Sequence, residues 1–518
     1  PGPAPSVQTL FPKCTPTYVA TPPQLEKPQG MLLFFYISDL HLDPYYDPSV
    51  GPGSGCLCQR PAAGVQCPAG SGSHFGQYGC DSPPQLVQET ARVMRSVLPD
   101  PDFILIAGDL TRHNADKLPG DSFTVVQGPH GVVANATQLI TDAFPNVPLT
   151  HITPAIGNND VVPDYYLNIT EQPNAQLNRL RGVWNATLPG AEAQTMFSHN
   201  GYYAKQLHPK LRLVVLNTLL YSKSHHPDST ADEDPLQQFA WMESQLQTAR
   251  GNGYKIILAS HVGPNVGTYN YENLWEAQYV ERYLSVASGF ADVIAGQLFA
   301  HIHRDFMALT AVDAPASSSG VLAPMFTPLA VSPIYDNNPG FHVVAYDLEA
   351  GEIADFASYH ADLTGTTSAN TVASVAADAV RSAERATQEA DARRPRPVGE
   401  FALLEHGHEM QQTPPASADR TLTVAAPAVA ALGDGGATLR WACGYTARGL
   451  WGVPDLSGTS ANDFLARLQH NQTLLQAFVQ NEAARSFPCD STCLSKQLCA
   501  IKHVKKANVD QCQAKIAM

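Results

Sequence analysis

Short apolar runs recur along the chain and alternate with segments of helical periodicity. The apolar runs have the length of strands buried on both faces and lie at 31–37, 102–107, 149–156, 211–216, 255–259 and 292–299. Apolar residues at helical spacing lie between them, at 82–98, 133–144 and 235–250. Strands that alternate with helices predict an α/β or α+β sandwich with a largely parallel core.

Changes in composition divide the chain into four parts. Residues 1–30 are rich in proline and lack periodicity, so we expect an extended arm, and residues 31–363 hold the alternating pattern of the main domain. Residues 364–440 are poor in large apolar side chains and rich in alanine and proline, which favours a linker or insertion. Residues 441–518 predict a small helical domain that its four late cysteines cross-link.

The overall charge narrows the classes of partner. The chain has 518 residues, of which 44% are hydrophobic, and a net charge of −15. This charge argues against a general nucleic-acid surface, because phosphate backbones bind basic faces. An anionic substrate stays open, since bound metal ions set the local potential of a site by themselves. No apolar run approaches the roughly 20 residues that cross a bilayer, so we expect a globular monomer without a transmembrane segment.

Cysteines and glycosylation sequons favour an oxidising, secretory route. The ten cysteines are Cys14, Cys443, a first group of Cys56, Cys58, Cys67 and Cys80, and a last group of Cys489, Cys493, Cys499 and Cys512. The sequons, which predict N-glycans, begin at Asn135, Asn168, Asn185 and Asn471. No C-x2-C pair supports a zinc site, so disulfides are the preferred interpretation and their pairing stays open. We expect a secreted protein or one of the lysosomal or vacuolar lumen, with a signal peptide already removed before Pro1.

Five of the apolar runs end in side chains that bind metals. In chain order these endings are Asp39-x-His41, Gly108-Asp109, Gly157-Asn158-Asn159-Asp160, His261 and His301-x-His303. The carboxyl ends of neighbouring parallel strands meet at one edge of a sheet, so we expect the five endings to converge. Strand alternation places residues i and i+2 on one face, which predicts that both imidazoles of the last ending point at one spot.

This set of residues is typical of a site that hydrolyses a phosphoester. Two metal ions about 3.5–4 Å apart acidify a bridging water and bind the phosphoryl oxygens, and such a pair is held by a bridging carboxylate with oxygen and imidazole ligands. Each ending has an ordinary structural explanation when taken alone: a surface Asp-x-His, a turn at Gly-Asp, or a hydrogen-bonded core histidine. Five endings on separate strand-like runs favour a metal site over these explanations.

The endings resemble the calcineurin-like metallophosphoesterase signature, D-x-H, GD, GN-[HN], H and GH-x-H. The chain as a whole is similar to the acid sphingomyelinase-like phosphodiesterases, through segments such as SDLHLDPYY, FGQYGCDSP, VIAGQLFAHIHRD, NNPGF and CDSTCLSKQLCAI. This resemblance implies a metallophosphoesterase sandwich of two central mixed β-sheets flanked by helices. It also implies a phosphoric diester hydrolase with two divalent metal ions.

The resemblance assigns roles to individual residues. One metal ion would be held by Asp39, His41, Asp109 and His303. The other would be held by Asp109, Asn158, His261 and His301, with Asp109 bridging. His113 matches a family histidine that contacts the phosphate and protonates the leaving oxygen. The family's metal is zinc, although these ligands also suit manganese or iron.

Two positions depart from the family pattern. Ala300 replaces the glycine that usually precedes the first paired histidine. Asn159 stands where most relatives carry a histidine, and we keep it with His113 as a candidate catalytic residue. An asparagine cannot donate a proton as an acid, so that role falls to His113 or to a metal-bound water. The sequence GNND also resembles the vacuolar endopolyphosphatases, which keeps polyphosphate among the candidate substrates.

The sequence therefore predicts a two-metal phosphodiesterase of the acid sphingomyelinase-like family. In the expected reaction a metal-bridging hydroxide attacks phosphorus in line and cleaves a phosphodiester or phosphoanhydride bond. Sphingomyelin, nucleotides and polyphosphate are the candidate substrates. An endopolyphosphatase is the closest alternative, and a non-catalytic binding protein on the same fold is an alternative of another class.

Overall fold

The computed structural model describes residues 10–53, 56–60, 65–117, 121–364, 439–485 and 487–516. All of them belong to one compact unit, which comprises Pro1–Thr371 and Thr438–Met518. Apart from Thr364, Leu439 and Arg440, the predicted linker at 364–440 lies outside the described residues, and so do the first nine residues of the predicted arm. The division of the chain into four parts therefore stays a prediction.

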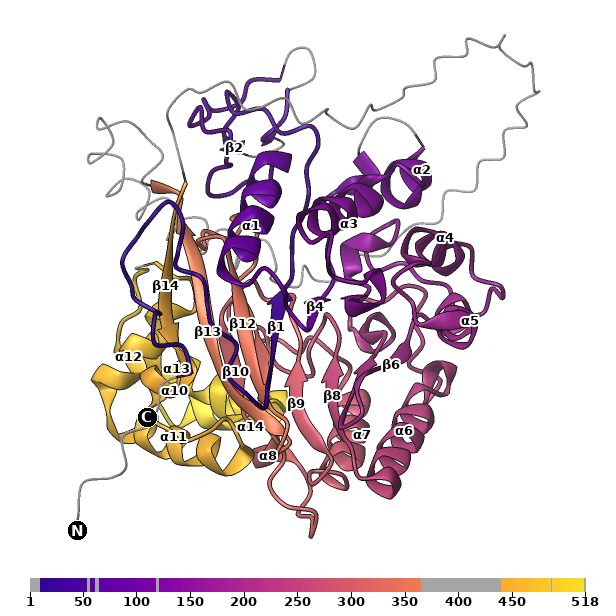
Figure 1. Ribbon diagram of the computed structural model, residues 1–518, viewed down its shortest axis with the longest axis vertical. Coiled ribbons are helices and arrows are strands. Elements are labelled where there is room, and N and C mark those ends of the chain that lie inside the picture. Colours follow the sequence, from indigo (N-terminus) through magenta and orange to yellow (C-terminus); the bar gives the residue numbers. More distant parts are fainter. Residues whose placement is uncertain are drawn as a thin grey trace. The chain divides into compact units, whose positions relative to one another are not determined.

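The first of two six-stranded sheets contains three parallel strands that lead to the site. Its strand order is β14-β13-β12-β1-β4-β5 (Figure 1). The parallel strands are β1 (Met31–Ile37), β4 (Phe103–Ile106) and β5 (Ile152–Pro154). The antiparallel strands are β12 (Gly340–Asp347), β13 (Glu352–Asp362) and β14 (Arg440–Thr446). All residues of β1 except Met31 are buried, because this apolar run is covered on both faces.

The second sheet has the order β10-β11-β9-β8-β7-β6. Its inner strands β7 (Leu211–Val215), β8 (Lys255–Ala259), β9 (Ile294–Leu298) and β11 (Met325–Thr327) are parallel. Its edge strands β6 (Tyr203–His208) and β10 (Phe306–Ala308) run antiparallel to their neighbours. The two sheets pack closely: a Cβ on Gly296 of β9 would lie 2.4 Å from Cδ1 of Ile353 in β13, so a larger residue would require the Ile353 side chain to shift.

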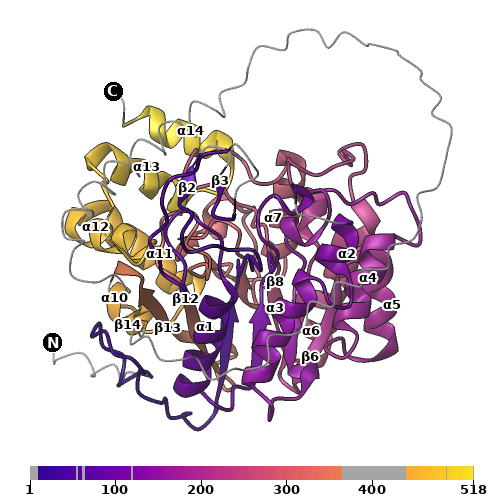
Figure 2. The same ribbon diagram turned by 90° about the horizontal axis from the view of Figure 1, so that it is seen from above.

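Helices flank the sheets. The helices between residues 84 and 313 are α1 (Pro84–Val97), α2 (Ser122–Gln127), α3 (Val132–Ala143), α4 (Ala175–Trp184), α5 (Gly190–Asn200), α6 (Gln238–Asn252), α7 (Ala277–Ser288) and α8 (Thr310–Asp313). Helix α6 contacts β8 and α5 contacts β6. Figure 2 shows α2, α4 and α5 together near β6, on the side away from β14.

The C-terminal region is helical and packs on both sheets. Its helices are α10 (Ala447–Trp451), α11 (Gly458–His470), α12 (Gln472–Asn481), α13 (Ser491–Lys502) and α14 (Lys506–Ala514). Helix α10 contacts β13 and α13 contacts β10, and Figure 2 shows α11 to α14 gathered on the β14 side. None of the helices among the described residues has both the length and the hydropathy needed to span a membrane.

All ten cysteines form disulfides. Short bridges close the cysteine-rich loop before α1 and the C-terminal helices, namely Cys56–Cys67, Cys58–Cys80, Cys489–Cys493 and Cys499–Cys512. The bridge Cys14–Cys443 joins the N-terminal arm to β14. Each of the two main-chain hydrogen bonds between Val19 and Trp441 measures 2.8 Å, so the arm also pairs with the edge strand.

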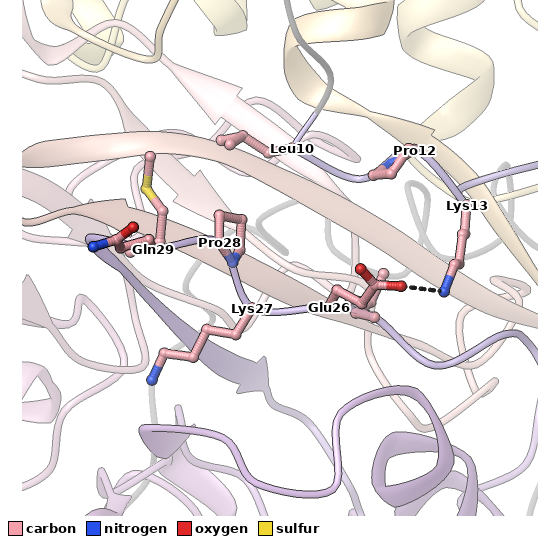
Figure 3. A pocket seen from close by; sticks show the side chains of 9 residues that line it. Leu10, Pro12, Lys13, Glu26, Lys27, Pro28 and Gln29 are labelled. Carbon is pink, nitrogen blue, oxygen red and sulfur yellow. Dashed lines mark hydrogen bonds and ion pairs between the residues drawn. The ribbon is translucent and has the colours of Figure 1, made fainter.

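The N-terminal arm borders a pocket with a volume of about 470 Å³. Figure 3 shows the two arm segments that line it, Leu10 to Lys13 and Leu25 to Gln29, with the ion pair between Lys13 and Glu26 across one end. The ammonium nitrogen and the carboxylate oxygen of this pair are 3.0 Å apart, and both side chains are largely exposed. This ion pair joins the two arm segments to each other, whereas the N–H of Leu25 donates to the carbonyl of Val97 at 2.8 Å and so ties the second segment to the last residue of α1.

The structure confirms the predicted fold class, with two mixed sheets, flanking helices and a disulfide-linked helical C-terminal region. Two strands have the predicted bounds, 31–37 and 255–259. The run at 149–156 differs, because Leu149–His151 forms a 3-10 turn and only Ile152–Pro154 pairs as β5. The helix predicted at 235–250 also differs: Pro235–Gln237 is a 3-10 turn, and the helix spans Gln238–Asn252.

Candidate metal centre

Five loops bring the predicted ligands together beyond the carboxyl ends of five strands. Strands β1, β4 and β5 of the first sheet lead to Asp39 and His41, to Asp109, and to Asn158 and Asn159. Strands β8 and β9 of the second sheet lead to His261 and to His301 and His303. The site therefore lies where the parallel strands of both sheets end, which is the position expected for an α/β sheet.

The ligand atoms form a continuous cluster. Oδ1 of Asp39 lies 3.3 Å from Nε2 of His303 and 3.7 Å from Nε2 of His41. Oδ2 of Asp109 lies 3.5 Å from Nε2 of His41 and 3.1 Å from Nε2 of His261. Asp109 therefore stands between the two groups of ligands, where a bridging carboxylate is required.

Three overlapping groups of side chains could each hold a cation. In every group the ligand atoms lie within 4.8 Å of one another. The groups are Asp39, His41 and Asp109; His41, His113 and His303; and Asp109, His261 and His301. The amide oxygen of Asn158 adds to the last group, 3.1 Å from Nε2 of His261.

The two paired histidines belong to different groups, so the prediction that both point at one spot is wrong. Strand β9 ends at Leu298, before either histidine, and the chain then enters a loop. His301 and His303 have φ angles of 76° and 55°, which strand alternation does not allow. The loop directs His301 toward Asp109 and His303 toward Asp39.

Two glycines allow the Asp109 and Asn158 loops to meet. A Cβ on Gly157 would lie 2.1 Å from both the main-chain nitrogen and Oδ1 of Asp109. Gly108 has a φ of +88°, and a Cβ there would lie 2.8 Å from the nitrogen of Gly157. Only glycine fits at these close approaches, which explains why glycine precedes each of these ligands.

The GNND segment holds Asp109 in place. The main-chain N–H of Asn159 donates to Oδ1 of Asp109 at 2.8 Å, and its side-chain amide donates to Oδ2 at 2.9 Å. The carboxylate of Asp160 accepts from the N–H groups of Asp109, Leu110 and Gly157 at 2.9–3.0 Å. The two loops are therefore tied together directly beneath the ligands.

Main-chain carbonyls orient two of the histidines. Nδ1 of His41 donates to the carbonyl of Thr111 at 2.8 Å, and Nδ1 of His261 donates to the carbonyl of Ala107 at 2.7 Å. Each bond leaves Nε2 as the atom that faces the carboxylates. This is the arrangement in which an imidazole binds a metal ion.

Charges in the cluster compensate each other. Burial lowers the pKa of His41 and of His261, but the carboxylates of Asp39 and Asp109 outweigh it and raise each pKa to about 9. Burial lowers the pKa of His301 to about 3 and that of His303 to about 4, so both imidazoles are neutral. Burial alone would raise the pKa of Asp39, yet His303, His41 and His261 hold it well below its usual range.

The residues present fit metal ions. Oδ1 of Asp39 is buried and has no hydrogen-bond donor, although three imidazole nitrogens lie within 4.0 Å of it. A buried carboxylate oxygen without a donor is costly, and a cation would satisfy it. Two carboxylates, an amide oxygen and four imidazoles are the mixed donor set that divalent transition metals bind.

His113 lies beside the cluster with partners of its own. Its ring stacks on that of His41, with centroids 4.1 Å apart. Its Nδ1 donates to Oδ1 of Asp81 at 3.0 Å, and Nε2 is 3.4 Å from the hydroxyl of Tyr335. Burial raises the pKa of Asp81, but the neighbouring charges of His113, His41 and Arg112 outweigh it and hold the pKa below its usual range. Asp81 is therefore an ionised carboxylate, and it fixes the orientation of the His113 ring.

The sequence alone does not indicate roles for Asp81, Tyr165 or Tyr335. Asp81 lies within the segment FGQYGCDSP, which carried part of the family resemblance, but no spacing rule links it to His113. Tyr165 and Tyr335 lie in loops, and their hydroxyls reach His301 and His113 at 3.2 and 3.4 Å. Only the folded chain brings these side chains to the cluster.

Comparisons with known proteins agree with this geometry. The family model described as calcineurin-like phosphoesterase matches residues 32–305, more than half of the chain. The chain is 29% identical to acid sphingomyelinase-like phosphodiesterase 3b of Homo sapiens, over 91% of this chain and 88% of that protein. It is 30% identical to the cyclic GMP-AMP phosphodiesterase SMPDL3A of Homo sapiens, over 65% of this chain and 72% of that protein. Sphingomyelinase phosphodiesterase D of Dictyostelium discoideum is also 30% identical, over 56% of this chain and 62% of that protein.

Proposed function

Because the chain belongs to the calcineurin-like phosphoesterase family, we propose that it is a binuclear metal-dependent phosphodiesterase. It hydrolyses phosphodiester or phosphoanhydride bonds of soluble or small lipid-derived substrates. The observation that carries the proposal is the convergence of seven potential ligands from five strand ends on one cluster, with Asp109 between its two halves. Membership of a phosphoesterase family, relatives named as phosphodiesterases and a site with this donor set point to the same chemistry.

The ligand set divides between two ions. Asp39, His41, Asp109 and His303 would hold one ion. Asp109, Asn158, His261 and His301 would hold the other. Zinc is the proposed metal, and manganese or iron also suit these donors. When bound, the ions neutralise charge on the phosphoryl oxygens and lower the pKa of water to near neutrality.

The other residues of the site handle the proton and the geometry. His113 protonates the leaving oxygen, and Asp81 holds its ring with Nε2 toward the substrate. Asn159 is a positioning residue: both of its hydrogen bonds fix the carboxylate of Asp109, and an amide has no proton to give as an acid. Of His113 and Asn159, only His113 can therefore act as the acid.

Several features support a lumenal or secreted location. The five disulfides persist in oxidising compartments, and N-glycans at Asn135, Asn168, Asn185 and Asn471 belong to the same route. The side chains of Asn185 and Asn471 are exposed, which an attached glycan requires. We assign the protein to the extracellular space or to a lysosomal or vacuolar lumen, as a monomer.

Replacement of Asp109 by alanine tests the proposal. Loss of the bridging carboxylate should abolish hydrolysis of bis(p-nitrophenyl) phosphate, by at least about a thousandfold, and reduce the bound metal measured by elemental analysis. Asp142→Ala, at an exposed position of α3, is the matched control and should retain both. Full activity of Asp109→Ala would refute the metal assignment.

A substrate panel then separates the candidate substrates. The named relatives are a sphingomyelinase phosphodiesterase, an acid sphingomyelinase-like phosphodiesterase and a cyclic GMP-AMP phosphodiesterase. A choline phosphodiester, a nucleotide and inorganic polyphosphate are therefore compared at acidic and neutral pH. Shortening of polyphosphate without cleavage of the other two would identify an endopolyphosphatase. An absence of metal in the purified protein, together with no hydrolysis of any substrate, would favour a binding protein on this fold.

A further inference from the structure

The metal centre opens to solvent along one edge. Most of the proposed ligands are fully buried, including Asp39, His41 and His261. The partly exposed side chains that contact the cluster include His113, His301, Tyr165 and Tyr335. The exposed side chain of Asp164 also lies here, where it accepts from the side-chain amide of Asn158 at 2.8 Å. A phosphoryl group that approaches the cluster from solvent would meet side chains of this set.

The two halves of this opening are built alike. On one side, the hydroxyl of Tyr335 lies 3.4 Å from Nε2 of His113. On the other side, the hydroxyl of Tyr165 lies 3.2 Å from Nε2 of His301, and the two rings are nearly perpendicular, at 86°. Each half thus pairs a partly exposed imidazole with a phenol.

The backbone of Tyr165 is held at this position. Its N–H donates to the carbonyl of Asn158 at 3.1 Å, and its carbonyl accepts from the N–H of His226 at 3.1 Å. The φ of Tyr165 is +61°, in the left-handed region that bulky residues rarely adopt. Backbone strain of this kind persists where surrounding contacts enforce it, and it is concentrated at functional sites.

Asn159 does not contribute to the partly exposed side of the cluster. It is 3% exposed, and both its N–H and its amide donate inward to Asp109. The hydroxyl of Tyr165, by contrast, belongs to a partly exposed side chain and lies 3.2 Å from Nε2 of His301. Developing negative charge on a phosphoryl group is stabilised by donors fixed in advance at such a place.

We propose that Tyr165 contacts the substrate, donating a hydrogen bond from its hydroxyl to a non-bridging phosphoryl oxygen on the His301 side of the metal centre. This rests on the proposed phosphodiesterase function and extends it to one further catalytic residue. Its role is to bind and orient the phosphoryl group, while His113 supplies the proton to the leaving oxygen.

The experiment compares the wild type with Tyr165→Phe and Tyr166→Phe, each loaded with metal and assayed for metal content. Tyr166 is the neighbouring tyrosine, and its main-chain carbonyl accepts from the Gln176 amide. Binding of inorganic phosphate is measured by calorimetry, and hydrolysis of bis(p-nitrophenyl) phosphate by kcat and KM. We expect Tyr165→Phe to keep its metal, to bind phosphate about tenfold more weakly, and to lose about ten- to a hundredfold in kcat/KM. Tyr166→Phe should stay within about twofold of the wild type.

Two results would overturn the inference. Unchanged phosphate affinity and kcat/KM in Tyr165→Phe would remove Tyr165 from the site. Loss of metal, with unchanged phosphate affinity per loaded site, would make Tyr165 only an orienting partner of His301. If the wild type hydrolyses no phosphodiester, the proposed function fails, and the calorimetric comparison still decides whether Tyr165 binds the phosphoryl group.

Discussion

Five of the proposed ligands adopt left-handed backbone conformations. Asp39, His41, Asp109, His301 and His303 have φ angles between 41° and 76°. Each non-glycine residue held in such a conformation costs about 1 to 3 kcal/mol. Hydrogen bonds such as that from the N–H of Asp109 to the carboxylate of Asp160 offset part of this cost and hold the loops in these conformations. The strain places all five side chains on the inner side of their loops.

Gly157→Ala should disrupt the centre without touching a ligand. The new methyl group would lie 2.1 Å from the main-chain nitrogen and Oδ1 of Asp109, which forces the two loops apart. We expect loss of bound metal and of hydrolysis, with a decrease of about 1 to 3 kcal/mol in the free energy of unfolding.

Gly182→Ala is the control for this substitution. Gly182 lies within α4, and a Cβ there meets no atom within 4 Å. Alanine should raise the free energy of unfolding by about 0.5 to 1 kcal/mol and leave metal content unchanged. Equal metal content in both variants, measured after identical purification, would contradict the role given to Gly157.

At the residue scale, the sequence predicted the candidate ligands better than the residues that hold them in position. Residue chemistry and spacing pointed to the five strand endings, and the family resemblance selected seven candidate ligands among them. The structure brings all seven side chains to one cluster. Asp81 and Tyr165 could not be predicted, because their positions depend on how long loops fold rather than on any local period. Whether each side chain binds metal stays a prediction until the substitutions are made.

At the scale of elements, the sequence located the strands that end at the site. The runs at 31–37 and 255–259 were predicted with their observed bounds, because both are unbroken and covered on both faces. The short strands β10 and β11 have three residues each, too few to show a period. The core was predicted as largely parallel, which holds for the central strands, whereas β12, β13 and β14 are antiparallel.

A C-terminal turn holds two loops of the site. The carbonyl of Glu482 accepts from the N–H of Asp305, two residues after His303. The carbonyls of Ala483 and Ala484 accept from the main chain and the side chain of Asn338 at 3.0 and 2.8 Å. Asn338 lies three residues after Tyr335, so the turn bears on both His303 and the Tyr335–His113 pair.

Asn338→Ala should weaken this link. The variant loses the bond to Ala484 and the bond that its Oδ1 accepts from Tyr78 at 2.6 Å. We expect a decrease of about 1 to 3 kcal/mol in the free energy of unfolding and a several-fold decrease in kcat. Asn508→Ala, which removes a 2.7 Å bond to Asp313 in the same C-terminal region, should cost similar stability with kcat unchanged. Equal kcat values in the two variants would contradict the expectation that this turn affects catalysis.

At the scale of the whole molecule, buried carboxyl groups set the pH dependence of stability. Burial raises the pKa of Glu482 to about 8 and that of Asp355 to about 7. Between the ordinary pKa of each group, 4.5 for Glu482 and 3.8 for Asp355, and these raised values, the folded protein binds more protons than the unfolded chain. The contribution of each group is therefore fully present below its ordinary pKa and is lost as the pH rises to about 8 for Glu482 and about 7 for Asp355. Lys205, whose pKa burial lowers to about 7, adds stability only as the pH rises above 7.

Glu482→Gln should remove part of this pH dependence. Glutamine resembles the protonated carboxyl group, so the variant should be more stable than the wild type at pH 8, by on the order of 2 kcal/mol, and similar to it at pH 4.5. Denaturant unfolding at the two pH values measures the difference. Glu192→Gln, at an exposed position of α5, should leave the profile unchanged. A wild type that is equally stable at both pH values would contradict the expectation.

Composition and cysteine content predicted a cross-linked globular fold but not its connections. Ten cysteines allow many pairings, and Cys14 and Cys443 are 429 residues apart, so no spacing rule could match them. Their pairing depends on the arm reaching β14, which only the folded chain decides.

The Cys14–Cys443 disulfide gives the molecule a second covalent connection between residues 10–364 and 439–516, independent of the peptide bonds between them. A protease cut at any single peptide bond between Leu363 and Arg440 would leave one molecule made of two chains. Such a molecule would migrate as intact protein until its disulfides were reduced, and the strand pairing of β13 with β14 would keep its two halves in register.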